Sequence, residues 1–249
     1  MKNRVKKSLK QFWQTTLAPK NWLRQLNTRR GFFTWVLTLF TLKTILAYGA
    51  DFEWLHVQDP LQVLLMLVNP IGFTMILFSL TLFIKPKQLY YGTLLILDTV
   101  MTLLLYLNVV YFREFSDFMS INTMLGYSTV NQGGKAAGAI AFGFHDILFW
   151  LDILVLLGLI LARKIKLDPR PLPRFQPFKW LTVGVFVLMA NLFLSDIDRP
   201  QLLTRQFDRE YMVKYLGLGP FTIYDAINTY QTSQIRKSAT PSEFTQVKN

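Results

Sequence analysis

The sequence contains no cysteine and only two histidines, His56 and His145. Without cysteine the chain can form neither a disulfide nor a thiolate metal site, and nothing about its redox compartment can be inferred. Asp146 follows His145, but two adjacent residues make a weak metal site, and His56 belongs to a different loop. We therefore predict no metal site and no cofactor in this chain.

Charged residues are also scarce. They make up 17% of the 249 residues, whereas hydrophobic residues make up 51% and the mean hydropathy is +0.28. A soluble domain of this length is rarely so apolar. The composition therefore indicates a membrane protein.

Acidic residues are few compared with basic ones, 15 against 27, which gives a net charge of +12. A nucleic-acid-binding protein gathers its basic residues on one soluble face. Here they are divided among short segments that flank apolar runs. This distribution is typical of a membrane protein, and we predict no nucleic-acid partner.

Long apolar runs are abundant. A helix needs roughly 20 apolar residues to cross about 30 Å of hydrocarbon. Five runs approach this length, at about 32–48, 61–84, 89–110, 147–162 and 180–195. The sequence therefore predicts an all-α membrane protein whose transmembrane domain, residues 31–196, has five transmembrane helices.

The basic residues also predict the orientation, because Lys and Arg accumulate in cytoplasmic loops. Nine precede the first run, two lie between the second and third, and six lie between the fourth and fifth. The loop after the first run has none, and the loop after the third has two. We expect a multi-pass protein of the cell membrane with a cytoplasmic N-terminus and an extracellular C-terminus.

Residues 1–30 form a basic arm without acidic residues. Because about 30 polar and basic residues precede the first apolar run, the arm is not a cleavable signal peptide. Apolar residues recur every three or four positions, with lysines between them, which predicts a cytoplasmic basic amphipathic helix on the inner leaflet. The alternative is a disordered basic tail.

Three ionisable residues lie inside the apolar runs: Lys43, Asp98 and Asp152. Each would be costly in contact with lipid, so each should have a partner or face a polar cavity. Counting about 1.5 Å per residue allows Lys43 to pair with Asp98 or with Asp152. We favour an ion pair that fixes helix register over a proton or ion relay.

Residues 197–231 are too polar to cross a bilayer and too apolar to be a simple tail. We predict two extracellular juxtamembrane helices here. Asp198 would cap the first, with Pro200 in its first turn, and Gly217 would end it. A Gly-Pro turn at 219–220 would lead into the second. The polar residues 232–249 have the composition of a linker.

The outer segments hold the candidate sites. Basic residues there could bind lipid phosphate through charge-assisted hydrogen bonds or dock against another domain. Alternatively, they only pair with Asp208 and Glu210. We interpret two tyrosines, Tyr211 and Tyr215, as interface anchors. The full candidate set is Arg113, Asp117, Arg199, Arg205, Arg209, Tyr211, Lys214 and Tyr215.

Several strings in these segments are long and irregular. They are NVVYFR at 108–113, FSDF at 115–118, DRP at 198–200, LLTR at 202–205, FD at 207–208, VKYLG at 213–217 and TIYD at 222–225. With these strings, and over nearly its whole length, the chain resembles the membrane portion of the lipoteichoic acid synthases of Gram-positive bacteria.

The resemblance implies a function in lipoteichoic acid synthesis and cell wall biogenesis. Such enzymes transfer glycerol phosphate from phosphatidylglycerol onto a growing polyglycerolphosphate chain, using an extracellular domain with a threonine nucleophile and a manganese or magnesium ion. No position of this sequence matches that motif, so no catalytic residue can be assigned, and we expect the chain alone to be inactive.

Two functions remain open. In the first, the chain is the membrane domain that anchors and orients the extracellular catalytic domain of the same polypeptide. Its other partners are the phospholipid bilayer and phosphatidylglycerol, which it would help to present. In the second, it is a freestanding small transporter or lipid-handling protein in which Lys43, Asp98 and Asp152 form a polar pathway.

Overall fold

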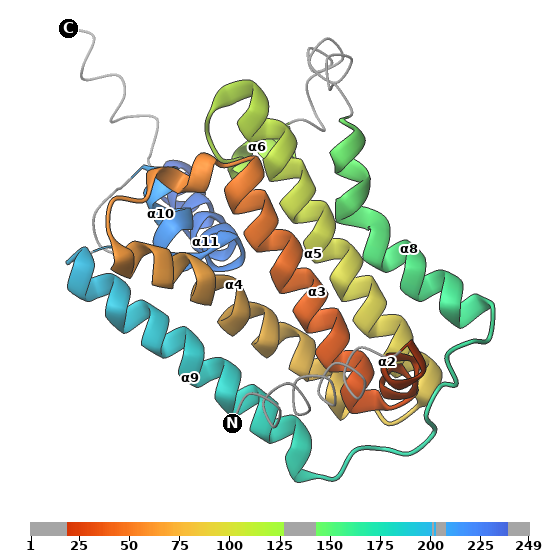
Figure 1. The fold of residues 1–249 in the computed structure, drawn as a ribbon. Helices are drawn as coiled ribbons and strands as arrows, with labels where there is room; N and C mark the ends of the chain where they lie inside the picture. The colour runs from red at the N-terminus through yellow and green to blue at the C-terminus, as the bar shows by residue number, and fades with distance from the viewer. Residues whose placement is uncertain (1–18, 127–142, 201, 203–207, 239–249) are drawn as a thin grey trace, which may run out of the picture.

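The computed structural model describes residues 19–126, 143–200, 202 and 208–238, and all regular elements in these ranges are helices. Four are long and apolar enough to cross a membrane, and they form a bundle (Figure 1). They are α3 (Arg29–Ala50), α4 (Pro60–Ser79) with its continuation η2 (Leu80–Phe83), α5 (Lys87–Phe115) and α9 (Phe175–Asp198). They match the first, second, third and fifth predicted runs, which confirms an all-α, multi-pass membrane protein.

The fourth predicted run forms α8 (Ile147–Leu161), which lies beside α5 (Figure 1). Its 15 residues are fewer than a full crossing needs. The short helix η3 (Phe144–Asp146) precedes it directly. The count of five spans therefore stays a prediction.

Two of the bundle helices, α3 and α4, begin where the sequence supplies a capping side chain. The Thr28 hydroxyl accepts a hydrogen bond from the Gly31 backbone N–H at 3.1 Å, at the start of α3. Asp59 does the same for the Gln62 N–H at 3.0 Å, with Pro60 as the first residue of α4. These caps satisfy backbone donors that the membrane could not satisfy.

Two glycines allow α4 and α9 to pack closely. A Cβ atom on Gly72 would lie 2.9 Å from the backbone nitrogen of Leu188, and one on Gly184 would lie 3.0 Å from that of Ile76. Small residues at such crossings let two backbones approach without lipid between them. The α4–α9 contact is the most extensive helix pair among the described residues.

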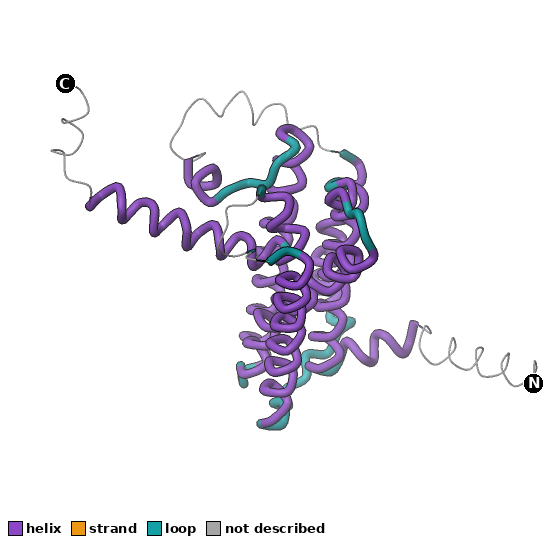
Figure 2. Tube along the Cα trace, turned by 90° about the vertical axis from the view of Figure 1, so that its left-hand side faces the viewer, coloured by secondary structure: helices purple, strands orange, loops and turns teal. Residues whose placement is uncertain are grey.

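Four short helices and one long polar helix, α11, lie outside the four apolar bundle helices. They are α2 (Pro19–Leu26), η1 (Glu53–His56), α6 (Ile121–Gly126), α10 (Arg209–Leu216) and α11 (Leu218–Ser238). Figure 2 shows α2 and α11 projecting from opposite sides and opposite ends of the bundle. Most of the predicted N-terminal arm, residues 1–18, lies outside the described residues.

The outer segment differs from the prediction in its boundaries. Asp198 is the last residue of α9 and not a cap, because α9 remains helical after its apolar run ends. Gly217 ends α10 as predicted, with φ of 86°. Gly219 and Pro220 lie in the first turn of α11, where proline is tolerated, so the predicted turn is wrong. Helix α11 also continues to Ser238, beyond the predicted end at 231.

Candidate functional site

The structure brings the three ionisable residues of the bundle together in one charged triad, Lys43 of α3, Asp98 of α5 and Asp152 of α8. The Lys43 ammonium lies 3.2 Å from Asp98 Oδ1 and 2.8 Å from Asp152 Oδ2. The sequence left open which aspartate pairs with Lys43, and in the structure both do. The triad thereby joins three helices around one buried cation.

A second charged cluster joins the ends of α3 and α5 to the start of α8. The Arg113 guanidinium donates to Asp51 Oδ1 at 2.6 Å and to Asp146 Oδ1 at 2.8 Å. Burial favours the protonated acid, but the hydrogen bonds and charge of Arg113 outweigh it and lower the pKa of Asp146. Arg113 was a candidate lipid contact, and here it holds helices together.

Asp117 and Arg209, two further candidates, pair with each other. Arg209 also donates to the Phe118 carbonyl oxygen at 3.3 Å. This links the segment after α5 to the start of α10. Nearby, the Asp225 carboxylate of α11 accepts a hydrogen bond from the Ile121 N–H, the first residue of α6, at 2.6 Å.

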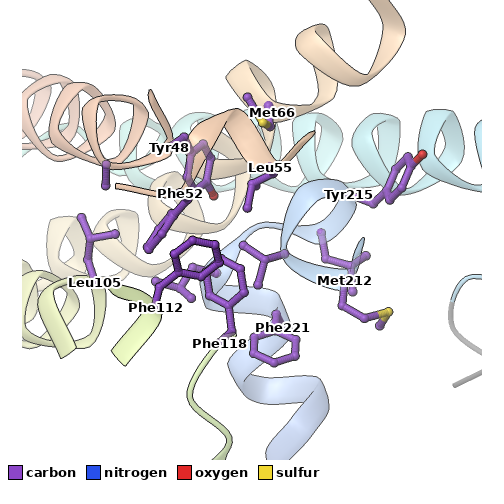
Figure 3. Packing of buried hydrophobic residues seen from close by; sticks show 14 of the residues in the cluster. Tyr48, Phe52, Leu55, Met66, Leu105, Phe112, Phe118, Met212, Tyr215 and Phe221 are labelled. Atoms are coloured by element: carbon purple, nitrogen blue, oxygen red, sulfur yellow. The ribbon is translucent and has the colours of Figure 1, made fainter. Parts of the chain in front are cut away.

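Aromatic side chains fill the space beneath these polar links. Figure 3 shows Phe52, Phe112, Phe118 and Phe221 gathered between the outer segments and the bundle. Phe118 lies 4.8 Å from Phe52 and 6.4 Å from Phe221, measured between ring centroids. All four side chains are buried. Phe118, in the segment after α5, is therefore a core residue.

The bundle holds the bend between α10 and α11 through three polar side chains. The Asn69 amide of α4 donates to the Lys214 carbonyl at 2.9 Å and accepts from the Tyr48 hydroxyl at 3.0 Å. From α9, Asn191 and Ser195 both donate to the Tyr215 carbonyl, at 2.7 and 3.2 Å. We call α10, α11 and this bend the platform. The last carbonyls of α10 are thus satisfied by side chains of two transmembrane helices.

Sequence reasoning missed these polar side chains. Asn69 and Asn191 are 1% exposed, although both lie in apolar runs. An asparagine within an apolar run could have indicated these contacts. A buried amide needs a hydrogen-bond partner in the membrane, just as a buried charge does.

Lys214 faces the protein and not the lipid surface. Its ammonium donates to the His56 carbonyl at 3.1 Å and lies 4.8 Å from the centre of the Tyr211 ring. Burial lowers the pKa of Lys214. The prediction that Lys214 contacts lipid phosphate is therefore not supported by its position.

Tyr215 is fully buried, so its predicted role as an interface anchor is wrong. Its hydroxyl donates to Asp198 Oδ2, which also accepts from Gln62 Nε2 at 3.4 Å. Burial, together with the Asp198 hydrogen bond, raises the pKa of Tyr215 to about 12. These bonds join the end of α9 to α4 and α10.

Arg199 and Tyr211 are partly exposed, as are the ion-paired candidates Arg113, Asp117 and Arg209. The guanidinium carbon of Arg199 lies 5.4 Å from the centre of the Tyr211 ring, and Nε lies 3.4 Å from the Tyr215 hydroxyl. Arg205 lies outside the described residues. Glu210, expected to pair with these basic residues, instead lies 2.7 Å from His56 Nδ1.

His56 belongs to η1, an unusual turn between α3 and α4. All four of its residues have positive φ, a conformation that costs L-residues energy. The hydrogen bond to Glu210 and its charge raise the pKa of His56. The turn therefore meets α10 through two contacts, the His56 ring and the His56 carbonyl.

Two observations bear on ligands. A groove of about 590 Å³ between α3 and α8 is lined mainly by leucines, with Lys43 and Asp152 among its lining residues. Among the residues that the structure describes, no group of three His, Asp or Glu side chains could hold a metal ion.

Comparisons with known proteins give the family. Residues 6–238 match the family described as "Lipoteichoic acid synthase N-terminal domain". Proteins named lipoteichoic acid synthase from Staphylococcus aureus strains USA300, NCTC 8325 and MRSA252 are each 36% identical over 220 residues. The match covers 88% of this chain and 33% of each relative, so the chain spans about a third of their length. No solved structure is significantly similar. The chain therefore belongs to the lipoteichoic acid synthase N-terminal domain family, the membrane part of these enzymes.

Proposed function

We propose that this chain anchors and orients an extracellular phosphoglycerol transferase domain of the same polypeptide. That domain would use phosphatidylglycerol to build polyglycerolphosphate. Its support is the similarity of this chain to proteins named lipoteichoic acid synthase. The manganese or magnesium ion of the reaction belongs, in this proposal, to the transferase domain.

The observation that carries the proposal is the fixed attachment of the platform. Side chains of α4 and α9 hold the bend at Gly217, and α6 holds the next turn of α11 through Asp225. A helix held at successive points keeps a fixed direction, whereas a simple tether would need none of these bonds. The platform can therefore set the angle at which a following domain leaves the bundle.

Contacts along α8 support five crossings. The chain at Asp146 contacts Arg113 at the C-terminal end of α5, and the Lys166 N–H donates to Asn27, next to the N-terminal end of α3. Residues 146–166 thus run from one end of the bundle to the other. With five crossings, the excess of basic residues at the N-terminal end supports a platform outside the cell.

Helix α11 carries an apolar stripe that fits a lipid surface. Ile223, Ile227 and Tyr230 are exposed and share one face of the helix. Asp225, on the opposite face, bonds to α6 beyond the end of α5. The stripe would therefore point back toward the level of the bundle, where an outer leaflet would lie. Contact with that leaflet would fix the height of α11.

Arg199 is our candidate for presenting phosphatidylglycerol. It is partly exposed, lies over Tyr211 and forms no ion pair with another described residue. We expect Arg199→Ala to weaken binding of the full-length protein to phosphatidylglycerol nanodiscs several-fold. Arg170→Ala, which removes an exposed arginine from the loop before α9, is the control. Equal affinity of the two variants would rule out lipid presentation by Arg199.

The anchoring proposal is tested in the full-length protein by polymer synthesis in cells. Adding ten Gly-Ser residues after residue 217 should uncouple α11 from the bundle and lower synthesis at equal protein levels. The same insertion after Ser238, beyond the platform, should have little effect. Equal synthesis with both insertions would show that orientation by the platform is not needed. The transporter alternative would gain support if this chain alone altered lipid movement across vesicles.

A further inference from the structure

The charged triad has an unbalanced charge. Lys43 supplies one positive charge, and Asp98 and Asp152 together supply two negative charges if both are ionised. Among the described residues, the ion pairs of these three side chains are Lys43–Asp98 and Lys43–Asp152; the other charged residues of α3 and α5 lie in the end turns of those helices. With both carboxylates ionised, the triad would carry one net negative charge inside the bundle.

Several oxygen atoms of the triad lack partners. Oδ1 of Asp98 lies 3.2 Å from the Lys43 ammonium, but Oδ2 of Asp98 and Oδ1 of Asp152 are buried without a hydrogen bond among the described residues, as is the hydroxyl of the neighbouring Thr102. The Asp98 side chain is 0% exposed and that of Asp152 is 9% exposed. An uncompensated charge surrounded by unsatisfied acceptors is strongly disfavoured in a membrane interior. A bound positive charge that also donates a hydrogen bond would remove both problems.

We propose that the triad binds one proton, shared between the carboxyl groups of Asp98 and Asp152. The proton is taken from water and makes the triad neutral: one ammonium, one carboxylate and one carboxylic acid. The acid O–H then donates to one of the buried oxygens. Two carboxyl groups close to one another share a proton for the same reason in other buried sites.

The position of the site gives the proton a structural consequence. Asp152 links α8 to Lys43 of α3 by an ion pair in the middle of the bundle. Asp146, just before α8, forms a second ion pair with Arg113 near the end of the bundle. Asp152 also lines the groove between α3 and α8, so the triad is nearest to the surface on that side. Loss of the proton would leave a net charge at this attachment and favour separation of α8 from α3.

Infrared spectroscopy of the protein in nanodiscs at neutral pH tests the proposal. A protonated carboxyl group gives a carbonyl stretch that is distinct from that of a carboxylate and shifts in deuterated water. We expect this band in the unmodified chain and its loss in both Asp98→Asn and Asp152→Asn. Either substitution leaves one lysine and one aspartate, which are neutral as an ion pair and need no proton. Glu114→Gln, on an exposed residue at the end of α5, should leave the band unchanged.

Two results would overturn the proposal: no such band in the unmodified chain, or a band that survives both asparagine substitutions. Lys43→Met gives an independent measurement, because two carboxyl groups without a lysine should both be protonated. The band area should then roughly double if the variant folds, and an unchanged area would contradict the shared-proton arrangement.

Thermal stability as a function of pH gives a second readout. If the folded chain binds one more proton than the unfolded chain, its stability falls as the pH rises. Asp98→Asn mimics the protonated form, so its melting temperature should fall less than that of the unmodified chain at alkaline pH. An identical pH dependence of the two melting temperatures would contradict proton binding by the triad.

Discussion

At the scale of single residues, uncharged polar side chains inside the bundle determine where the platform sits. Both polar atoms of the Asn69 side chain form hydrogen bonds: the amide nitrogen donates to a carbonyl of α10, and the oxygen accepts from the Tyr48 hydroxyl. Gly217 lies directly beside it, and a Cβ atom there would be 3.0 Å from Asn69 Oδ1. Position 217 therefore requires glycine, because a larger residue would crowd Asn69 and because glycine tolerates the positive φ of the bend.

We expect Asn69→Ala to destabilise the protein by about 1–2 kcal/mol, because it leaves the Tyr48 hydroxyl and a carbonyl of α10 without partners. Thermal unfolding in detergent measures the loss. Asn228→Ala, at an exposed position of α11, is the matched control and should change little. A similar effect of both substitutions would mean that the Asn69 hydrogen bonds do not hold the platform.

The contact between His56 and Glu210 predicts a pH dependence. Because Glu210 raises the pKa of His56 in the folded state, the contact stabilises the fold below the ordinary histidine pKa of about 6.5. This stabilisation is lost as the pH rises through the raised value. NMR titration of the two histidines should show His56 titrating at higher pH than in the Glu210→Gln variant. An unchanged His56 titration in that variant would refute the contact.

The sequence located the charged residues of the site better than it assigned their roles. Lys43, Asp98 and Asp152 stand out because charges in apolar runs are costly, and the structure brings them together. Lys214 was a candidate for lipid or domain contacts and Tyr215 for an interface anchor, but both side chains face the protein. Their spacing along α10 shows which residues share a face, but only the tertiary contacts decide which face is buried.

At the scale of elements, the long helices could be predicted because their lengths follow from the thickness of the bilayer. Helix ends were less predictable. Helix α9 continues to Asp198 because backbone hydrogen bonds do not stop where the apolar residues stop. The close contact of α4 with α9 was not predicted either, since Gly72 could be read equally as part of a kink at Pro70.

We expect Gly72→Ala to destabilise the bundle by about 1–3 kcal/mol, because the new methyl group would overlap the α9 backbone at Leu188. The melting temperature in detergent measures the effect. Gly92→Ala in α5 is the matched control, since a Cβ atom there meets nothing within 4 Å and alanine favours the helix. If both variants were equally stable, the α4–α9 contact would not be close-packed.

At the scale of the whole molecule, the orientation remains to be measured, and the absence of cysteine makes the measurement simple. Single cysteines introduced at Arg170 and at Asn228 provide unique labelling sites. With five crossings, a membrane-impermeant thiol reagent added to intact cells should label the cysteine at 228 and not the one at 170. Labelling of both after permeabilisation is the control. The reverse pattern would invert the proposed topology.

The length and direction of α11 have a consequence for where a following domain would work. Its 21 residues extend about 30 Å, and Figure 2 shows the helix running sideways out of the bundle. A domain joined to its far end would therefore lie beside the helix bundle and not above it. Its footprint would cover the annulus of bilayer lipids around the protein. If the anchoring proposal holds, the active site of that domain would then face the lipid headgroups of this annulus.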